Sequence, residues 1–139
     1  MTRSIGAIFH YAYLWQVDHS HGLDNPEDRT TTLVLTRKST DENGVEITHL
    51  FLLGLTDNPH HTQITVEIPP LEKRRGGLEP QRPAFVVISE YNYDALPHSF
   101  DYDANSKDFG HFSETFVRQL QQQFLVQIGT KTAKRVNRL

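Results

Sequence analysis

Cysteine is absent from all 139 residues of the chain, so disulfides, thiolate zinc sites and cysteine nucleophiles are excluded. Long apolar runs are absent too, because the longest, residues 50–55, falls far short of the ~20 residues of a membrane-spanning helix. The opening residues lack the uninterrupted apolar stretch of a secretory signal. We therefore expect a soluble cytoplasmic protein without a membrane partner.

An excess of positive charge is also lacking, since the formal net charge is −3. This balance argues against a protein that holds nucleic acid by its overall potential, although local basic patches remain open. The length fits one domain. We expect that domain to span residues 1–129, followed by a basic, flexible tail over residues 130–139.

The apolar pattern predicts a mainly β protein. Residues 5–17 alternate with the period of a strand that has one buried face. Residues 30–38 and 45–56 form two further strands, joined by a hairpin turn at Asn43-Gly44. Residues 19–28 are expected to form a loop, and shorter strands are expected within residues 62–68 and 84–89, with a polar connection between them.

The period changes to that of an amphipathic helix at Ser113, a good N-cap, and Gly129 is a good residue to end it. The segment between residues 90 and 110 has room for one short strand. The predicted fold class is therefore mainly β with a C-terminal helix, as a small barrel or strongly curved sheet.

Histidines raise the question of a zinc site beside Asp57, because two pairs occur, His19/His21 and His60/His61. Neighbouring residues of a strand face opposite ways, so the second pair cannot share one ligand on a strand. Residues 57–59 are a common turn sequence. No spacing typical of a metal site accompanies the histidines, and we expect no metal and no cofactor.

Five aromatic residues can either stack on bases or form core and interface: Tyr11, Tyr13, Trp15, Tyr91 and Tyr93.

The order of segments resembles a known family. A Gly precedes an opening strand (GAIFHYAYLW), an Arg leads into a hydrophobic strand (DRTTTLVLT), and a third strand ends in a hydrophobic-Thr step (LFLLGLTDNP). Three further segments follow in the same order as in the family: VEIPP, then GLEPQRPAFVVISEYNYDALP, which contains a Glu-x-Asn step, and finally FGHFSETFVRQLQQQF. Together they resemble the MazF/PemK toxins of type II toxin-antitoxin systems, and more closely a PemK-like branch. The resemblance runs roughly from Gly6 to Phe124 and depends on the order of the segments.

The resemblance implies an SH3-like small barrel of the MazF/PemK/CcdB type, usually a homodimer. It implies a growth-inhibiting, metal-independent endoribonuclease that is restrained by a cognate antitoxin. Such an enzyme cleaves single-stranded RNA through attack of the 2′-hydroxyl on the adjacent phosphate. By matching motifs, Arg29 and Thr56 are the candidate catalytic residues. The candidate substrate-binding residues are Asp57, Glu90, Asn92 and Tyr13.

A forked guanidinium and a hydroxyl donor can stabilise charge on a phosphate without a metal. Two positions depart from the family pattern: Thr30 stands where a proline usually follows the arginine, and Asp57 where a histidine often follows the threonine. A carboxylate ~4 Å from a phosphate charge repels it by roughly 1 to 4 kcal/mol, depending on exposure.

Simpler interpretations of the same residues exist. Arg29 can pair with Asp28 or Glu27, and Thr56 can be a β-former at a strand end. Glu90 and Asn92 can satisfy loop backbone rather than line a groove. The alternative function is a non-catalytic toxin-fold module, which acts on a protein target as CcdB-type relatives act on gyrase, or binds only an antitoxin.

Overall fold

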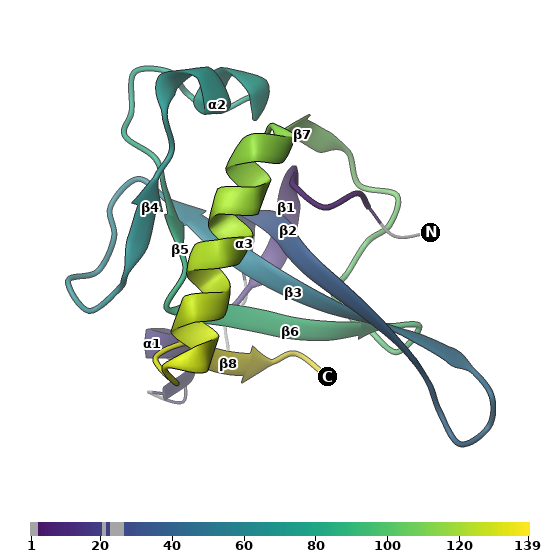
Figure 1. The fold of residues 1–139 in the computed structure, drawn as a ribbon. Coiled ribbons are helices and arrows are strands. Elements are labelled where there is room, and N and C mark those ends of the chain that lie inside the picture. The colour runs from purple at the N-terminus through teal and green to yellow at the C-terminus, as the bar shows by residue number, and fades with distance from the viewer. Residues whose placement is uncertain (1–2, 21, 23–26) are drawn as a thin grey trace.

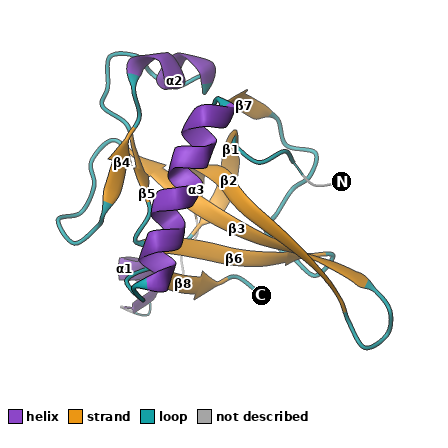
Figure 2. Cartoon of the chain, viewed as in Figure 1, coloured by secondary structure: helices purple, strands orange, loops and turns teal. Residues whose placement is uncertain are grey.

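The structure is a computed structural model that describes residues 3–20, 22 and 27–139. These residues form a mainly β fold with a long C-terminal helix (Figures 1 and 2). The elements in chain order are β1 (Ala7–Tyr13), α1 (Gln16–Ser20), β2 (Glu27–Thr40), β3 (Glu46–Thr56), β4 (Thr65–Glu67), α2 (Pro70–Arg75), β5 (Phe85–Val87), β6 (Glu90–Leu96), β7 (Asp108–His111), α3 (Glu114–Gly129) and β8 (Lys134–Asn137).

Strand β3 is the centre of the sheet. Strand β2 pairs along one of its edges, while β6 and then β5 pair along the other. The sheet continues through β1 to β7 on the first side and through β5 to β4 on the second. The described strands pair antiparallel, except that β8 lies parallel to β6. The end strands β4 and β7 are not paired with each other in the described part of the chain, so the sheet is open rather than a closed barrel.

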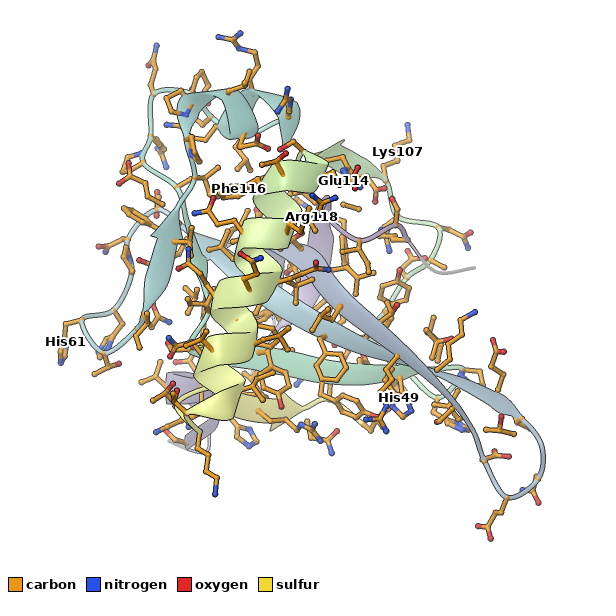
Figure 3. All side chains as sticks on the ribbon, viewed as in Figure 1. His49, His61, Lys107, Glu114, Phe116 and Arg118 are labelled. Atoms are coloured by element: carbon orange, nitrogen blue, oxygen red, sulfur yellow. The ribbon has the colours of Figure 1, made fainter. Side chains whose placement is uncertain are left out.

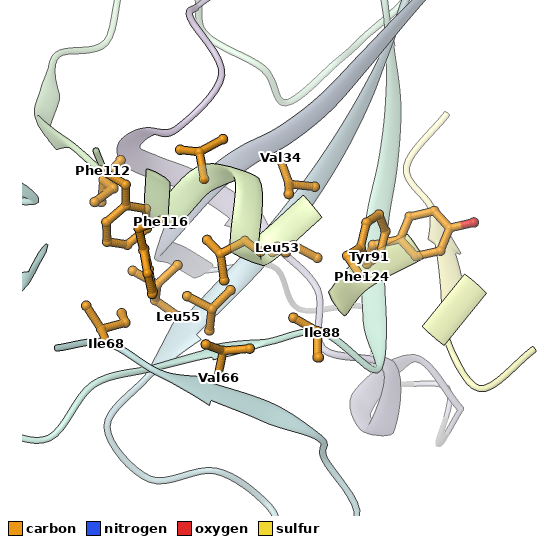
Figure 4. Close-up of a cluster of buried hydrophobic side chains, with 14 residues drawn as sticks. Val34, Leu53, Leu55, Val66, Ile68, Ile88, Tyr91, Phe112, Phe116 and Phe124 are labelled. Atoms are coloured by element: carbon orange, nitrogen blue, oxygen red, sulfur yellow. The ribbon is translucent and has the colours of Figure 1, made fainter. Parts of the chain in front are cut away.

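The hydrophobic core lies on both faces of the sheet. One cluster fills the space between the sheet and α3, which crosses it (Figures 1 and 4). Phe116, Leu120 and Phe124 of α3 contribute to this cluster, as do Leu53 and Leu55 of β3. A second cluster lies on the other face and is built from Ala7, Phe9, Tyr11, Tyr13, Leu33, Leu50 and Leu52.

Two local predictions are confirmed. The β2–β3 hairpin turns at Asn43-Gly44, where Gly44 has a φ of +82° and donates its N–H to the carbonyl of Asp41. Helix α3 begins after Ser113, whose hydroxyl accepts from the N–H of Phe116. Both features depend on neighbouring residues, which is why the sequence alone indicates them.

The first strand is shorter than predicted. It ends at Tyr13, and residues 16–20 form α1 instead of continuing the strand. The side chain of Asn92 accepts from the N–H of Leu14 at 2.9 Å and donates to its carbonyl at 2.8 Å. These bonds fix the chain where β1 ends. They come from a strand far away in sequence, so the alternation of residues 5–17 could not show them.

Three further elements differ from the prediction. Helix α2 lies within the segment expected to be a polar connection, and both β6 and β7 occur where one short strand was expected. The expected flexible tail contains β8, in which Val136 is fully buried. Beside it, Arg138 Nη2 donates to Asp101 Oδ2 at 2.8 Å. A single apolar residue among polar ones gives no periodic pattern, and its burial depends on the position of β6.

Among the described residues, no helix is long and apolar enough to cross a membrane.

Candidate functional site

The register of β2 and β3 brings Arg29 and Thr56 to the same place. The β2–β3 ladder ends at the pair Thr31 and Gly54, and Arg29 and Thr56 lie two residues beyond it, one on each strand. Both residues line the same cleft. Arg29 comes from the beginning of β2, and Thr56 is the last residue of β3.

Arg29 is half-buried and is held against β1. Its Nη1 donates a hydrogen bond to the carbonyl oxygen of Tyr13. This contact holds the guanidinium close to the end of β1. The alternative pairing of Arg29 with Glu27 involves a side chain outside the described part of the chain.

Thr56 caps the turn that follows β3. Its Oγ1 accepts from the N–H of Asn58 at 3.1 Å. A hydroxyl that accepts one bond can still donate its own hydrogen, so Thr56 remains a possible donor to a ligand. Asp57, the next residue, lies 3.3 Å from Nη1 of Arg82, and both side chains are largely exposed.

These residues line one open cleft of about 460 Å³, the strand-end cleft. Its charged members are two arginines and three carboxylates, so its formal charge is negative. The lining residues are Trp15, Asp28, Arg29, Thr30, Leu55, Thr56, Asp57, Leu78, Glu79, Arg82, Pro83 and Ala84.

Trp15 supplies an aromatic wall to the cleft. Its ring lies against β3 at Gly54, where an added Cβ would come 2.6 Å from Cη2 of the indole. Only glycine allows this approach without displacement of the ring. The ring also contacts Tyr13 edge to face, with centroids 4.9 Å apart. The cleft therefore combines a flat ring, two guanidinium groups and a hydroxyl.

Three candidate substrate-binding residues lie outside this cleft. Glu90, Asn92 and Tyr13 are buried, and they hold the connection between β1 and α1. Asn92 binds both backbone groups of Leu14, and Glu90 Oε2 accepts from the N–H of Gln16 at 3.0 Å and from the hydroxyl of Tyr13 at 3.2 Å. A role in substrate binding stays a prediction for these three, while Asp57 lines the cleft with Arg29 and Thr56.

Burial governs the electrostatics of this buried group. It raises the pKa of Glu90 above its ordinary value, against the hydrogen bonds from Gln16, Gln63 and Tyr13, which lower it. It also raises the pKa of the Tyr13 hydroxyl, and the nearby carboxylate of Glu90 raises it further. Tyr13 therefore stays protonated and acts as a donor to Glu90.

Arg82 is a charged cleft residue that the sequence did not predict. It lies in the connection between α2 and β5, in a stretch with no periodic pattern. Phe85 pairs with Thr56, so Arg82, three residues earlier, reaches the end of β3. Arg82 could have been placed in the cleft only if the strand predicted at residues 84–89 were known to pair with the end of strand 45–56. The sequence does not specify which strands pair.

The histidines that the structure describes do not assemble with carboxylates into a metal site. In the described part of the chain, no three His, Cys, Asp or Glu side chains are arranged to hold a metal ion. His60 and His61 lie in the β3–β4 connection, where Nδ1 of His60 is 2.7 Å from Oγ1 of Thr62, and Figure 3 places His61 at the outer end of that loop. His21, of the other pair, lies outside the described residues.

Searches for similarity found no family model, curated protein or solved structure that matches this chain.

The fold and the site together define a mainly β chain with an open polar cleft at the ends of two central strands. A guanidinium, a hydroxyl and an indole converge there.

Proposed function

We propose that the chain is a metal-independent endoribonuclease of the MazF/PemK type that acts on single-stranded RNA. The observation that supports this most is that Arg29 and Thr56 line one open cleft. The same proposal takes the open sheet to be a variant of the family's SH3-like barrel. It also includes growth inhibition, a cytoplasmic location, a homodimer and a cognate antitoxin.

In the proposed reaction, the 2′-hydroxyl oxygen forms a bond to the adjacent phosphorus, and the bond from phosphorus to the 5′-oxygen breaks. The 2′-hydroxyl loses its proton and the 5′-oxygen gains one, which gives a cyclic phosphate and a 5′-hydroxyl. Negative charge grows on the phosphate oxygens. Arg29 offers a forked donor to that charge, and Thr56 offers its hydroxyl hydrogen. Trp15 offers a ring on which a base can stack.

RNA cleavage in EDTA tests this proposal directly. Purified protein is expected to cut a diverse pool of labelled single-stranded RNA and to leave cyclic phosphate ends. Arg29→Ala is expected to lower the rate by roughly 10²- to 10³-fold, because it removes the main charge-stabilising donor. Thr56→Val, which keeps the shape and removes the hydroxyl, is expected to slow cleavage as well.

The control is Arg118→Ala, which removes an exposed cation on α3 that pairs with Glu114. It lowers the net charge by the same amount and should cut RNA at the wild-type rate. Wild-type protein that leaves the RNA pool intact, or an Arg29→Ala variant that cuts as fast as wild type, would contradict the proposal.

A second function is favoured by the charge of the cleft, because three carboxylates accompany its two arginines. Under this alternative the chain is a non-catalytic toxin-fold module that binds a protein target or an antitoxin. Induced expression that halts growth while cellular and purified RNA stay uncut supports the module. Growth arrest that disappears with Arg29→Ala together with RNA cleavage supports the nuclease.

A further inference from the structure

Part of the sheet is left uncovered by α3, on the same face as the larger core cluster. The helix packs on Tyr91 through Phe124, and the long β2–β3 hairpin extends beyond it (Figure 1). In Figure 3, His49 lies on this uncovered part, on the opposite side of α3 from His61. Residues that pair across a ladder share a face of the sheet, so the ladders show which residues lie on the uncovered part. The open sheet face consists of the exposed and partly exposed residues Leu35, Arg37, Ser39, His49, Phe51, Tyr93, Arg135 and Asn137. Ile47, Tyr91 and Ala95 share the same side of the sheet but are buried.

The rings of the open sheet face are held in place by one another. His49 Nδ1 is 2.5 Å from the hydroxyl oxygen of Tyr93, and its Nε2 is 2.7 Å from Oγ of Ser39. The two rings are nearly parallel, with 25° between their planes. Phe51 contacts Tyr91 and Tyr93 with centroids 5.7 Å and 5.9 Å apart. Such fixed rings lose little conformational freedom when a ligand stacks on them.

The charges on this face are of one sign. The guanidinium carbon of Arg135 lies 4.7 Å from the ring centroid of Tyr93, and Arg135 Nε donates to the hydroxyl of Tyr91 at 3.0 Å. Arg37 is exposed and lies opposite His49 in the β2–β3 ladder.

The open sheet face has no carboxylate among these residues. Glu46, Glu90 and Asp94 occupy alternate positions near this face, which point the other way. Asp28 lies at the other end of β2, where it lines the strand-end cleft.

We propose that the open sheet face binds single-stranded RNA, as a second contact outside the strand-end cleft. Phosphates pair with Arg37 and Arg135, and bases stack on the partly exposed rings of His49, Phe51 and Tyr93 and on the guanidinium plane of Arg135. Charge complementarity selects this occupant, because a chain with a net charge of −3 presents here a surface with two arginines and no carboxylate. The inference rests on the proposed RNA substrate, but binding here does not require cleavage.

The test uses a labelled 2′-O-methyl oligouridine, which has no free 2′-hydroxyl and cannot be cut. Binding is measured by fluorescence anisotropy at several salt concentrations. The double variant Arg37→Ala/Arg135→Ala is expected to bind at least about tenfold more weakly at ~0.1 M salt. The slope of log K against log salt concentration is expected to become less negative by roughly 0.7 for each lost phosphate contact.

The chain contains a matched control. Lys38 and Lys134 are exposed cations one residue away on the same two strands, and alternation puts them on the opposite face. Lys38→Ala/Lys134→Ala changes the net charge equally and should bind within about twofold of wild type. Arg135 also packs on Tyr93, so its loss could disturb the fold as well as remove a phosphate contact. The single variant Arg37→Ala avoids this problem, and it is expected to weaken binding by about threefold.

Equal binding by the two double variants would overturn the inference, as would wild-type protein that does not bind the probe. A dimer that dissociates in the arginine variant but not in the lysine variant would also overturn it, because the occupant is then a second copy of the chain. Binding that depends on this face in a protein that cuts no RNA leaves the inference standing and contradicts the nuclease.

Discussion

Asp57 governs the charge that a phosphate would meet in the strand-end cleft. Its carboxylate pairs with Arg82 at 3.3 Å in an exposed position. Exposed pairs of this kind contribute little to stability. A phosphate that enters the cleft would compete with Asp57 for Arg82. The Asp57–Arg82 pair therefore lowers the affinity of the cleft for phosphate and adds little to the stability of the fold.

Asp57→Asn is therefore expected to tighten the binding of single-stranded RNA about fivefold, which corresponds to ~1 kcal/mol at the cleft. The substitution removes the repulsion and leaves Arg82 to the phosphate. Binding of the uncleavable oligonucleotide measures the effect. Glu42→Gln, which makes the same charge change at the exposed tip of the β2–β3 hairpin, should leave affinity unchanged. Equal gains in both variants would mean that only net charge matters.

Thr30, the other departure from the family pattern, has a structural reason. It pairs with His10 inside the β1–β2 ladder. Proline offers no N–H and is disfavoured inside a paired strand. The guanidinium of Arg29 is oriented instead by its hydrogen bond to the carbonyl oxygen of Tyr13.

At the scale of elements, one carboxylate joins the two helices α2 and α3. Glu72 of α2 is buried and accepts from the N–H and the hydroxyl of Ser113, both at 2.8 Å. Burial alone would raise the pKa of Glu72, but the bonds from Ser113 and the guanidinium of Arg75 together lower it below the ordinary 4.5. The N-cap of α3 thus depends on α2, a helix that the sequence did not predict.

A carboxyl group with a lowered pKa in the folded state stabilises the fold above its ordinary pKa, and that contribution is lost as pH falls through the folded value. Glu72→Gln is expected to cost about 1 to 3 kcal/mol at neutral pH, because the charged hydrogen bonds are lost. The difference from wild type should shrink as pH falls below 4.5. Urea denaturation at several pH values measures the free energy of unfolding.

Glu114→Gln is the control, since Glu114 stands at the start of the same helix but forms only an exposed pair with Arg118. It should cost no more than about 0.5 kcal/mol. A difference between Glu72→Gln and wild type that stays constant down to acid pH would contradict the proposed role of the charge.

At the scale of the whole molecule, the C-terminal segment completes the sheet. Strand β8 pairs in parallel with β6, and its Val136 is fully buried. Arg138 donates its N–H to the carbonyl of Tyr93 and its Nη2 to Asp101. The segment thereby holds β6, the strand that carries Tyr91 and Tyr93, on the side away from β3.

Val136→Ala is expected to lower the free energy of unfolding by about 1 to 3 kcal/mol, since it leaves a cavity beside β6. Lys134→Ala, at an exposed position of the same strand, should change it by no more than about 0.5 kcal/mol. Thermal or urea unfolding measures both. Similar values for the two variants would indicate that β8 is not part of the cooperative unit.

Local patterns were enough to predict the elements whose causes lie within a few residues. The Asn43-Gly44 turn, the N-cap at Ser113 and the alternation from Ala7 to Tyr13 belong to this group. The prediction that Arg29 and Thr56 lie near each other came from a resemblance of segment order, and the β2–β3 register brings both to the strand-end cleft.

The sequence by itself determined the mainly β class, the hairpin and the closing helix, because turn residues, caps and periodicity act between near neighbours. Only the tertiary structure decided where β1 ends, that α2 and β8 exist, and that Arg82 faces Asp57. These depend on contacts between residues far apart in the chain, such as Asn92 with Leu14 and Glu72 with Ser113. No local pattern records such contacts, since their free energy arises only when distant strands come together.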